Sequence, residues 1–207
     1  MGHYVIMEFL GTFVFTLALV LSSEPLPIGL ALMAMIYVGG HISGAHYNPA
    51  VSLASWVQRG LNNEALLSYM GSQVLGAAMA IMLARRITGS AYALDLPSNN
   101  LFDYALMEAL LTTVLVLVVL TVAKASAYKG SSVQGLIIGL TFASLISFGL
   151  NPTILNPAVA VGSMLTSLFF EGAMVGGPNV VLVYVVAPLA GGAVAAWLYN
   201  FLNERGK

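Results

Sequence analysis

The residues best suited to chemistry in this chain are two asparagines, each of which opens a copy of the same tetrapeptide. Asn-Pro-Ala-Val occurs at 48–51 and again at 156–159. Proline is favoured at the first position of a helix, where its missing N–H removes no hydrogen bond, and asparagine is a preferred residue just before it. Each copy therefore predicts a helix start. The six residues of the two Asn-Pro-Ala triplets are Asn48, Pro49, Ala50, Asn156, Pro157 and Ala158.

A helix start presents free backbone N–H groups and the positive end of the helix dipole. Two such starts that face one another would bind the oxygen atoms of neutral polar solutes and would repel cations. The elements that position the two starts therefore decide what the protein does.

The composition of the chain places most of its surface in a lipid bilayer. Of 207 residues, 59% are hydrophobic and only 7% are charged, and the mean hydropathy is +0.91. So few charges cannot form the solvated surface of a soluble domain. The net charge of −1 gives no reason to expect a nucleic-acid partner, and the absence of cysteine excludes disulfides and thiol chemistry.

Six long apolar segments are expected to cross the membrane as helices. A helix needs about 20 residues to span a hydrocarbon core ~30 Å thick, and it satisfies all its backbone hydrogen bonds within one segment. The predicted spans are Tyr4–Leu21, Leu26–Gly40, Glu64–Ile87, Leu101–Ala123, Ser132–Leu150 and Asn179–Phe201. The sequence thus predicts an all-α membrane protein with six transmembrane helices.

The two segments that begin with Asn-Pro are too short to span the bilayer. The helix predicted from Asn48 to Gly60 covers roughly 18 Å, and the helix from Asn156 to Phe170 is similar. Irregular backbone at membrane depth is tolerated only where protein buries it or where it lines a cavity. We therefore expect two re-entrant loops, each with a half-helix, along an aqueous path. The alternative is that both asparagines cap helices in loops outside the membrane.

The two halves of the chain resemble one another. A shift of 100 residues places Glu8 on Glu108, and a shift of 108 aligns the two Asn-Pro-Ala-Val copies. Each half, about 1–95 and 96–207, then contains three spans and one half-helix. Because three is odd, the second half enters the membrane from the opposite side, and such inverted repeats place their site near the midplane. We expect a single transmembrane channel domain over 1–207.

Positive charges indicate how the chain is oriented. Loops on the cytoplasmic side carry an excess of lysine and arginine. With the N-terminus inside, the inner side receives Arg59, Lys124, Lys129, Arg205 and Lys207, and the outer side receives only Arg85 and Arg86. We expect both termini to be cytoplasmic and the host bilayer to be the plasma membrane.

At these motifs the chain resembles the aquaporin and glycerol-facilitator family, the major intrinsic proteins, over essentially its whole length. The matching runs are 8–12 (EFLGT), 40–51 (GHISGAHYNPAV), 108–112 (EALLT) and 156–158 (NPA). One Asn-Pro-Ala is weak evidence, but two copies, each preceded by a helix that bears a glutamate, are strong evidence in a chain of six spans. The resemblance implies a homotetramer with one pore in each subunit.

Glu8 and Glu108 are acidic residues within predicted spans. A charged side chain at such a position costs roughly 2.5–3.5 kcal/mol on insertion scales, so these residues are functional by default. The resemblance favours a scaffold role, in which each carboxylate accepts hydrogen bonds from backbone N–H groups of a re-entrant loop; a proton relay is the alternative. His46 is expected to brace the first loop. Because His41 and His46 have no cysteine or acidic residue nearby, we expect neither a metal site nor a cofactor.

The outer selectivity filter departs from the family pattern. Many members carry arginine directly after the second Asn-Pro-Ala, whereas this chain has Val159. Counting back along the chain places Ile28, Ser144 and Thr153 at the other filter positions, with a slip of a residue or two open at Ser144. Such a filter has no aromatic ring and no fixed charge. We expect it to be wider and more apolar than a strict water filter.

Together these features predict a passive channel for water and small uncharged solutes. The positive ends of the two half-helices and the cost of desolvating an ion at the midplane would oppose the passage of protons and ions. A facilitator of glycerol or small polyols with little water selectivity is the nearest alternative, and an ion-permeable channel, a secondary transporter and a structural junction protein also stay open. The sequence contains no Ser/His/Asp set, phosphate loop or metal cluster, so we do not expect an enzyme.

Overall fold

The computed structural model describes residues 2–94, 96, 100–128 and 131–203, and within these ranges the chain is helical and has no strand. A 3-10 turn, η1, covers Ser126–Tyr128, and a π-helical segment, η2 (Leu182–Val186), joins two helices near the C-terminus. The α-helices are α1 (Gly2–Leu21), α2 (Pro25–Ser43), α3 (Pro49–Val57), α4 (Asn63–Thr88), α5 (Leu101–Lys124), α6 (Gln134–Phe148), α7 (Pro157–Glu171), α8 (Gly177–Val181) and α9 (Ala187–Asn203).

Five helical segments in the described part of the chain are long and apolar enough to cross a membrane. They are α1, α2, α4, α5 and the continuous stretch Gly177–Asn203, which comprises α8, η2 and α9. The remaining predicted span, Ser132–Leu150, forms α6, which is apolar but has only 15 residues and covers ~22 Å. It ends before Gly149 because Pro152, which has no backbone N–H, follows in the second re-entrant loop.

The half-helices α3 and α7 begin at the residues that the sequence predicts. Asn48 and Asn156 occupy the N-cap positions, and their side-chain oxygens accept hydrogen bonds from the backbone N–H of Ala50 at 2.9 Å and of Ala158 at 3.0 Å. Each cap satisfies an N–H that would otherwise be orphaned in apolar surroundings. The first half-helix is shorter than predicted and ends at Val57, whereas the second has 15 residues.

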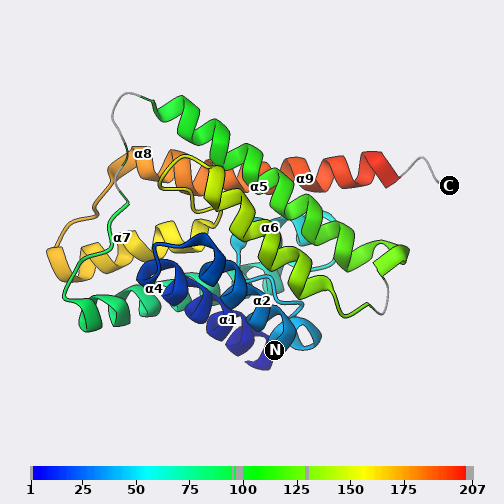
Figure 1. The fold of residues 1–207 in the computed structure, drawn as a ribbon, viewed down its shortest axis with the longest axis horizontal. Helices are drawn as coiled ribbons and strands as arrows, with labels where there is room; N and C mark the ends of the chain where they lie inside the picture. The colour runs from blue at the N-terminus through cyan, green and yellow to red at the C-terminus, as the bar shows by residue number, and fades with distance from the viewer. Residues whose placement is uncertain (1, 95, 97–99, 129–130, 204–207) are drawn as a thin grey trace.

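Helices of the two halves pack in matching pairs. α1 lies against α4 and α5 lies against α9, on opposite edges of the bundle (Figure 1). Glycine permits each close approach, because a Cβ on Gly76 would collide with the carbonyl oxygen of Phe9, and one on Gly191 with that of Ala109. Phe9 directly follows Glu8, and Ala109 directly follows Glu108. Equivalent contacts therefore occur at equivalent positions of the two halves.

The halves are joined along α2 and α6 and by the half-helices. A Cβ on Gly29 would collide with the carbonyl of Gly139, and one on Gly139 with the carbonyl of Gly29, so these two helices touch backbone to backbone. The half-helices cross over: α3 packs on α9, and α7 packs on α4 (Figure 1). Because each half-helix is held by the opposite half, their starts are directed toward each other in the interior.

The charges that indicate orientation are only partly within the described structure. Arg59 and Lys124 lie at one end of the bundle, near the end of α3 and of α5, and Arg85 and Arg86 lie in the last turn of α4. The remaining three positions of the expected inner set, Lys129, Arg205 and Lys207, lie outside the described residues.

Candidate functional site

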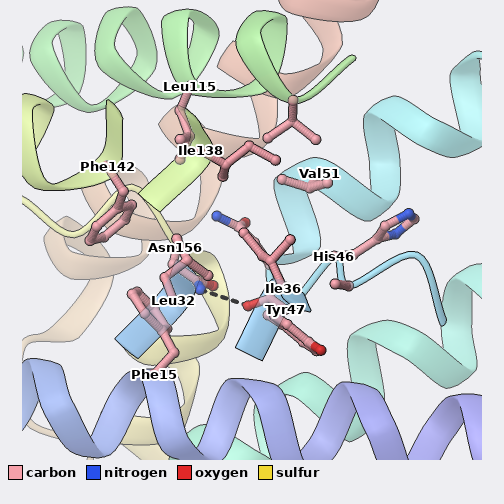
Figure 2. Close-up of a pocket in the computed structure, with 13 residues that line it drawn as sticks. Phe15, Leu32, Ile36, His46, Tyr47, Val51, Leu115, Ile138, Phe142 and Asn156 are labelled. Carbon is pink, nitrogen blue, oxygen red and sulfur yellow. Dashed lines mark hydrogen bonds between the residues drawn. The ribbon is translucent and has the colours of Figure 1, made fainter. Parts of the chain in front are cut away.

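The starts of the two half-helices are tied to one another by a reciprocal pair of hydrogen bonds. The Asn48 Nδ2 group donates to the carbonyl of Leu155 at 2.7 Å. The Asn156 Nδ2 group donates to the carbonyl of Tyr47 at 2.9 Å (Figure 2). Each acceptor is the residue just before the other asparagine. Tyr47 and Leu155 both have left-handed backbone, with φ of 50° and 55°, which turns their carbonyls toward the opposite loop.

Both asparagines line a small central cavity (Figure 2). Its volume is about 20 Å³, which is enough for about one water molecule. A side-chain amide has two N–H bonds, and the reciprocal pair uses one on each asparagine, so a second donor remains on each. The lining consists of Phe15, Leu32, Ile36, Ala45, His46, Tyr47, Asn48, Val51, Leu115, Val119, Ile138, Phe142 and Asn156.

Glu8 of α1 holds the first re-entrant loop. The carboxylate is fully buried, and its Oε1 accepts hydrogen bonds from the Ser43 hydroxyl at 2.6 Å and the His46 N–H at 2.9 Å. Its Oε2 accepts from the Tyr47 N–H at 2.7 Å and from the Gln73 amide at 2.8 Å. Four donors thus surround the charge, which compensates its desolvation.

Glu108 of α5 holds the second loop with fewer contacts. Its side chain is 2% exposed, and its two oxygens accept hydrogen bonds from the backbone N–H groups of Ile154 at 2.7 Å and Leu155 at 2.9 Å. These two residues directly precede Asn156. The two glutamates therefore act on equivalent segments, but Glu8 receives twice as many hydrogen bonds as Glu108.

His46 lies between the first loop and the first half-helix. Its Nδ1 is 3.1 Å from the Ser52 hydroxyl, and its ring packs edge-on against Tyr69 with centroids 5.3 Å apart. His46 is also among the residues that line the central cavity (Figure 2). No group of three or more metal-ligating side chains occurs in the described part of the chain.

Two tyrosines that sequence reasoning missed anchor the second loop. The Tyr184 hydroxyl donates to the carbonyl of Pro152 at 2.9 Å, and the Tyr104 hydroxyl donates to that of Asn151 at 3.1 Å. Tyr184 lies in the π-helical segment and is fully buried. A buried tyrosine needs a partner for its hydroxyl, but the sequence does not indicate which carbonyl supplies it.

A larger outer cavity of about 440 Å³ lies at the end of α1 and the start of α2. It contains two of the four predicted filter residues, Ile28 and Thr153. Among the described residues that line it, none is charged. The lining consists of Leu19, Ser22, Ser23, Pro25, Ile28, Tyr92, Ile146, Ser147, Gly149, Asn151, Pro152, Thr153 and Ile154.

The structure does not bring Ser144 or Val159 into the lining of this cavity. Ser144 is exposed on the same face of α6 as Leu140, and Ile146, two residues later, lies at the cavity instead. Two residues correspond to a rotation of about 200° around a helix, and this displacement lies within the slip of a residue or two that the sequence leaves open at Ser144. Val159 is fully buried in the apolar core.

Tyr92 is a further cavity residue that the sequence did not indicate. It belongs to the segment between α4 and α5, and its backbone carbonyl accepts a hydrogen bond from the Ser163 hydroxyl of α7 at 3.1 Å. Tyr92 adds an aromatic residue to the lining of the outer cavity, which the predicted filter lacked. No local pattern could have identified it, because the segment is irregular and its position depends on α7.

Comparisons with known proteins establish the family. The sequence profile of the major intrinsic proteins matches residues 22–199. The chain is 32% identical over 190 residues to aquaporin AqpM of Methanothermobacter thermautotrophicus, an alignment that covers 86% of this chain and 76% of the relative. The chain therefore belongs to the major intrinsic protein family.

Two further comparisons concern length and fold. The chain is 34% identical over 185 residues to aquaporin NIP1-1 of Oryza sativa subsp. japonica. The alignment covers 86% of this chain but only 62% of the length of that relative. The structure of the aquaglyceroporin from Plasmodium falciparum matches with a TM-score of 0.80 at 24% identity, over 96% of this chain and 95% of that one. The predicted fold, six membrane helices with two re-entrant half-helices in an inverted repeat, is confirmed, and the chain is an integral membrane protein.

Proposed function

We propose that this chain is a passive transmembrane channel for water and small uncharged solutes. The observation that carries the proposal is the reciprocal bonding of Asn48 and Asn156 across the half-helix starts, beside a cavity that both line. Each asparagine keeps one amide N–H bond that the reciprocal pair does not use, and we infer that both are directed to the cavity that the two residues line. An oxygen atom that enters it accepts both, which orients a water molecule or a hydroxyl group at the point where the two halves meet.

The same geometry opposes ions. Both half-helices direct their positive ends to the cavity, and apolar side chains form most of its wall. No carboxylate belongs to the described lining, because Glu8 and Glu108 direct their oxygens to loop donors. A cation there would lose its hydration with little in exchange. Carbonyls of residues 44–46 and 153–155 provide acceptors for the solute on either side.

At the outer mouth we propose a filter made of Ile28, Thr153 and Ile146. Val159, at the position where many family members have arginine, is buried in the apolar core. The uncharged lining of the outer cavity and its volume of about 440 Å³ favour a second candidate function, a facilitator of glycerol or small polyols. Three-carbon polyols fit such a mouth and find hydroxyl and carbonyl partners there. The ratio of glycerol to water permeability decides between the two candidates.

We propose that Glu8, Glu108 and His46 support the loops and do not relay protons. Neither glutamate lines the central or the outer cavity, and every carboxylate oxygen accepts a hydrogen bond from the protein. A relay requires a group that exchanges protons with water in the path. This arrangement favours the scaffold role.

The experiment that tests the channel is an osmotic shift on proteoliposomes followed by stopped-flow light scattering. A channel gives volume changes that are faster than in protein-free liposomes, do not saturate with solute concentration and depend weakly on temperature. Saturable uptake that requires an ion gradient would instead identify a transporter. A structural junction protein would leave the permeability of the liposomes unchanged.

We further propose that the chain forms a homotetramer with one pore per subunit, and that both termini face the cytoplasm, in the plasma membrane. The apolar residues exposed on α1, α2, α4 and α5 provide surface for lipid and for neighbouring subunits. Chemical cross-linking in native membranes tests the assembly, and protease protection of a C-terminal tag in sealed vesicles tests the orientation.

A further inference from the structure

Two phenylalanines lie at the boundary between the central and the outer cavity. Phe15 of α1 and Phe142 of α6 are each 1% exposed, and their rings meet edge to face with centroids 5.0 Å apart at 86°. Both rings line the central cavity (Figure 2). Aromatic rings in this geometry are in direct contact, so no solute fits between them.

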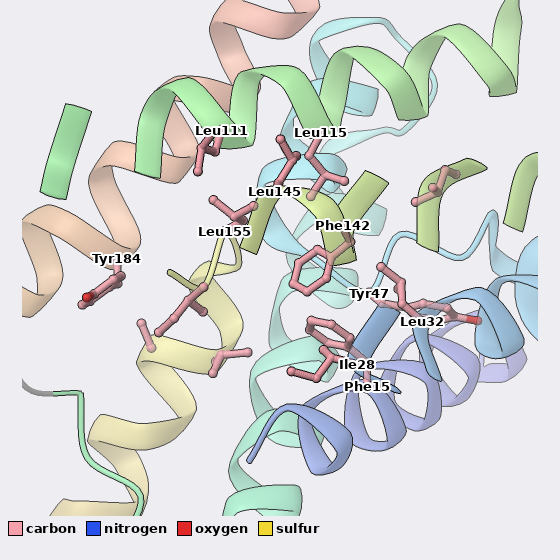
Figure 3. Packing of buried hydrophobic residues seen from close by; sticks show 14 of the residues in the cluster. Phe15, Ile28, Leu32, Tyr47, Leu111, Leu115, Phe142, Leu145, Leu155 and Tyr184 are labelled. Atoms are coloured by element: carbon pink, nitrogen blue, oxygen red, sulfur yellow. The ribbon is translucent and has the colours of Figure 1, made fainter. Parts of the chain in front are cut away.

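The helices that pass this boundary show that the two rings lie between the cavities. On each of three helices, one residue lines the central cavity and the residue one turn away lines the outer cavity. These pairs are Phe15 and Leu19 on α1, Leu32 and Ile28 on α2, and Phe142 and Ile146 on α6. Figure 3 shows the rings of Phe15 and Phe142 next to each other, with Ile28 and Leu32 of α2 beside them. A solute that moves from one cavity to the other passes the rings.

We propose that Phe15 and Phe142 form an aromatic gate that selects solutes by size inside the channel put forward above, on which this inference rests. The outer cavity, at about 440 Å³, admits a three-carbon polyol, whereas the space on the inner side of the rings is about 20 Å³, so the narrower selection by size falls at the rings. Water passes when the rings part slightly by rotation of the side chains. Glycerol passes only when they separate fully, so the gate favours water and slows three-carbon polyols.

The test compares water and glycerol permeability of wild-type and Phe142→Val proteoliposomes by stopped-flow light scattering. We expect glycerol permeability to rise about tenfold and water permeability about threefold, or ~1.4 and ~0.7 kcal/mol at ~1.4 kcal/mol per factor of ten. The contact energy of an aromatic pair is of this size. The temperature dependence of water flux should fall as well, because the rings no longer have to part.

Phe148→Val is the matched control, because Phe148 lies on the same helix, is 59% exposed and is absent from both cavity linings. It should leave both permeabilities unchanged. The double variant Phe15→Leu with Phe142→Val should add little to Phe142→Val alone, since the two rings act as one gate. Gel filtration and thermal unfolding verify that each variant is folded, and Phe142→Leu replaces Phe142→Val if the latter is not.

The outcomes separate the gate from the channel. If wild type conducts water and the folded Phe142 variant has the same glycerol and water permeabilities, the gate is refuted and the channel stands. If no variant and no wild-type sample exceeds protein-free liposomes, the channel itself is refuted, and the gate with it. A Phe142 variant that conducts glycerol while wild type conducts little supports the gate directly.

Discussion

Replacement of the two buried glutamates by glutamine tests whether they hold the re-entrant loops. In Glu108→Gln, one carboxylate oxygen becomes an NH₂ group, so the backbone N–H of either Ile154 or Leu155 loses its acceptor. A hydrogen bond to a charged group contributes ~1.5–3 kcal/mol. We expect the free energy of unfolding to fall by about this amount.

Glu8→Gln should cost about twice as much. Each oxygen of Glu8 accepts two hydrogen bonds, one pair from Ser43 and His46 and the other from Tyr47 and Gln73. The new NH₂ group therefore faces two donors in either orientation, and the expected loss is ~3–6 kcal/mol. Rotation of the Gln73 amide would present its otherwise unpartnered Oε1 to the new NH₂ group, but the backbone N–H of Tyr47 would still lose its acceptor, which places the loss toward the lower end of this range.

The assay is equilibrium unfolding of the purified variants in detergent micelles, followed by far-UV circular dichroism, with folded yield as a second measure. Glu24→Gln is the control, because Glu24 is an exposed acidic residue before α2. The expected order of stability is wild type and Glu24→Gln, then Glu108→Gln, then Glu8→Gln. Unchanged stability of Glu8→Gln together with a selective loss of proton flux would refute the scaffold and identify a proton relay.

Three further predictions concern packing and the loop anchors. Gly76→Ala should lower the free energy of unfolding by ~1–3 kcal/mol through overpacking against α1. Gly71→Ala, on the same helix but with open space beside it, should raise the free energy of unfolding by up to ~1 kcal/mol. Chemical denaturation measures both changes. Tyr184→Phe should cost ~0.5–1.5 kcal/mol in the same assay by removing one hydrogen bond to the second loop. Arg85→Gln, which breaks a partly exposed ion pair with Glu171 at 2.9 Å, should change the free energy of unfolding, measured by thermal denaturation, by less than ~1 kcal/mol. The Arg85 guanidinium also lies 4.6 Å from the centre of the Phe170 ring, and a larger loss would mean that this cation–π contact dominates.

The half-helices are the part of the fold that the sequence predicts best. Proline at 49 and 157 and asparagine just before each act through hydrogen bonds that reach only two residues along the chain. The starts of α3 and α7 could therefore be read without knowledge of any other element. The C-terminal ends of the half-helices could not be read in this way, because the end of an exposed helix depends on what packs around it. α3 ends at Val57, and α7 continues to Glu171.

The residues of the outer cavity show where such reasoning fails. Ile28 could be placed because only the short irregular segment 44–47 separates α2 from Asn48, so a count of residues back from Asn48 still selects the correct face of α2. Ser144 could not, because the irregular segment 149–155 lies between α6 and Asn156. The path of that segment depends on contacts with Glu108, Tyr104 and Tyr184.

By itself, the amino-acid sequence determined the membrane environment, the number of spans, the two half-helices and the equivalence of the two halves, because these follow from hydrophobicity and from contacts between near neighbours. Only the tertiary structure decided that Asn48 meets the carbonyl of Leu155, 107 residues away, and that the ring of Phe15 meets that of Phe142. Such contacts depend on the rotation and depth of every helix between them. A difference of two residues in one loop changes which side chain faces the path.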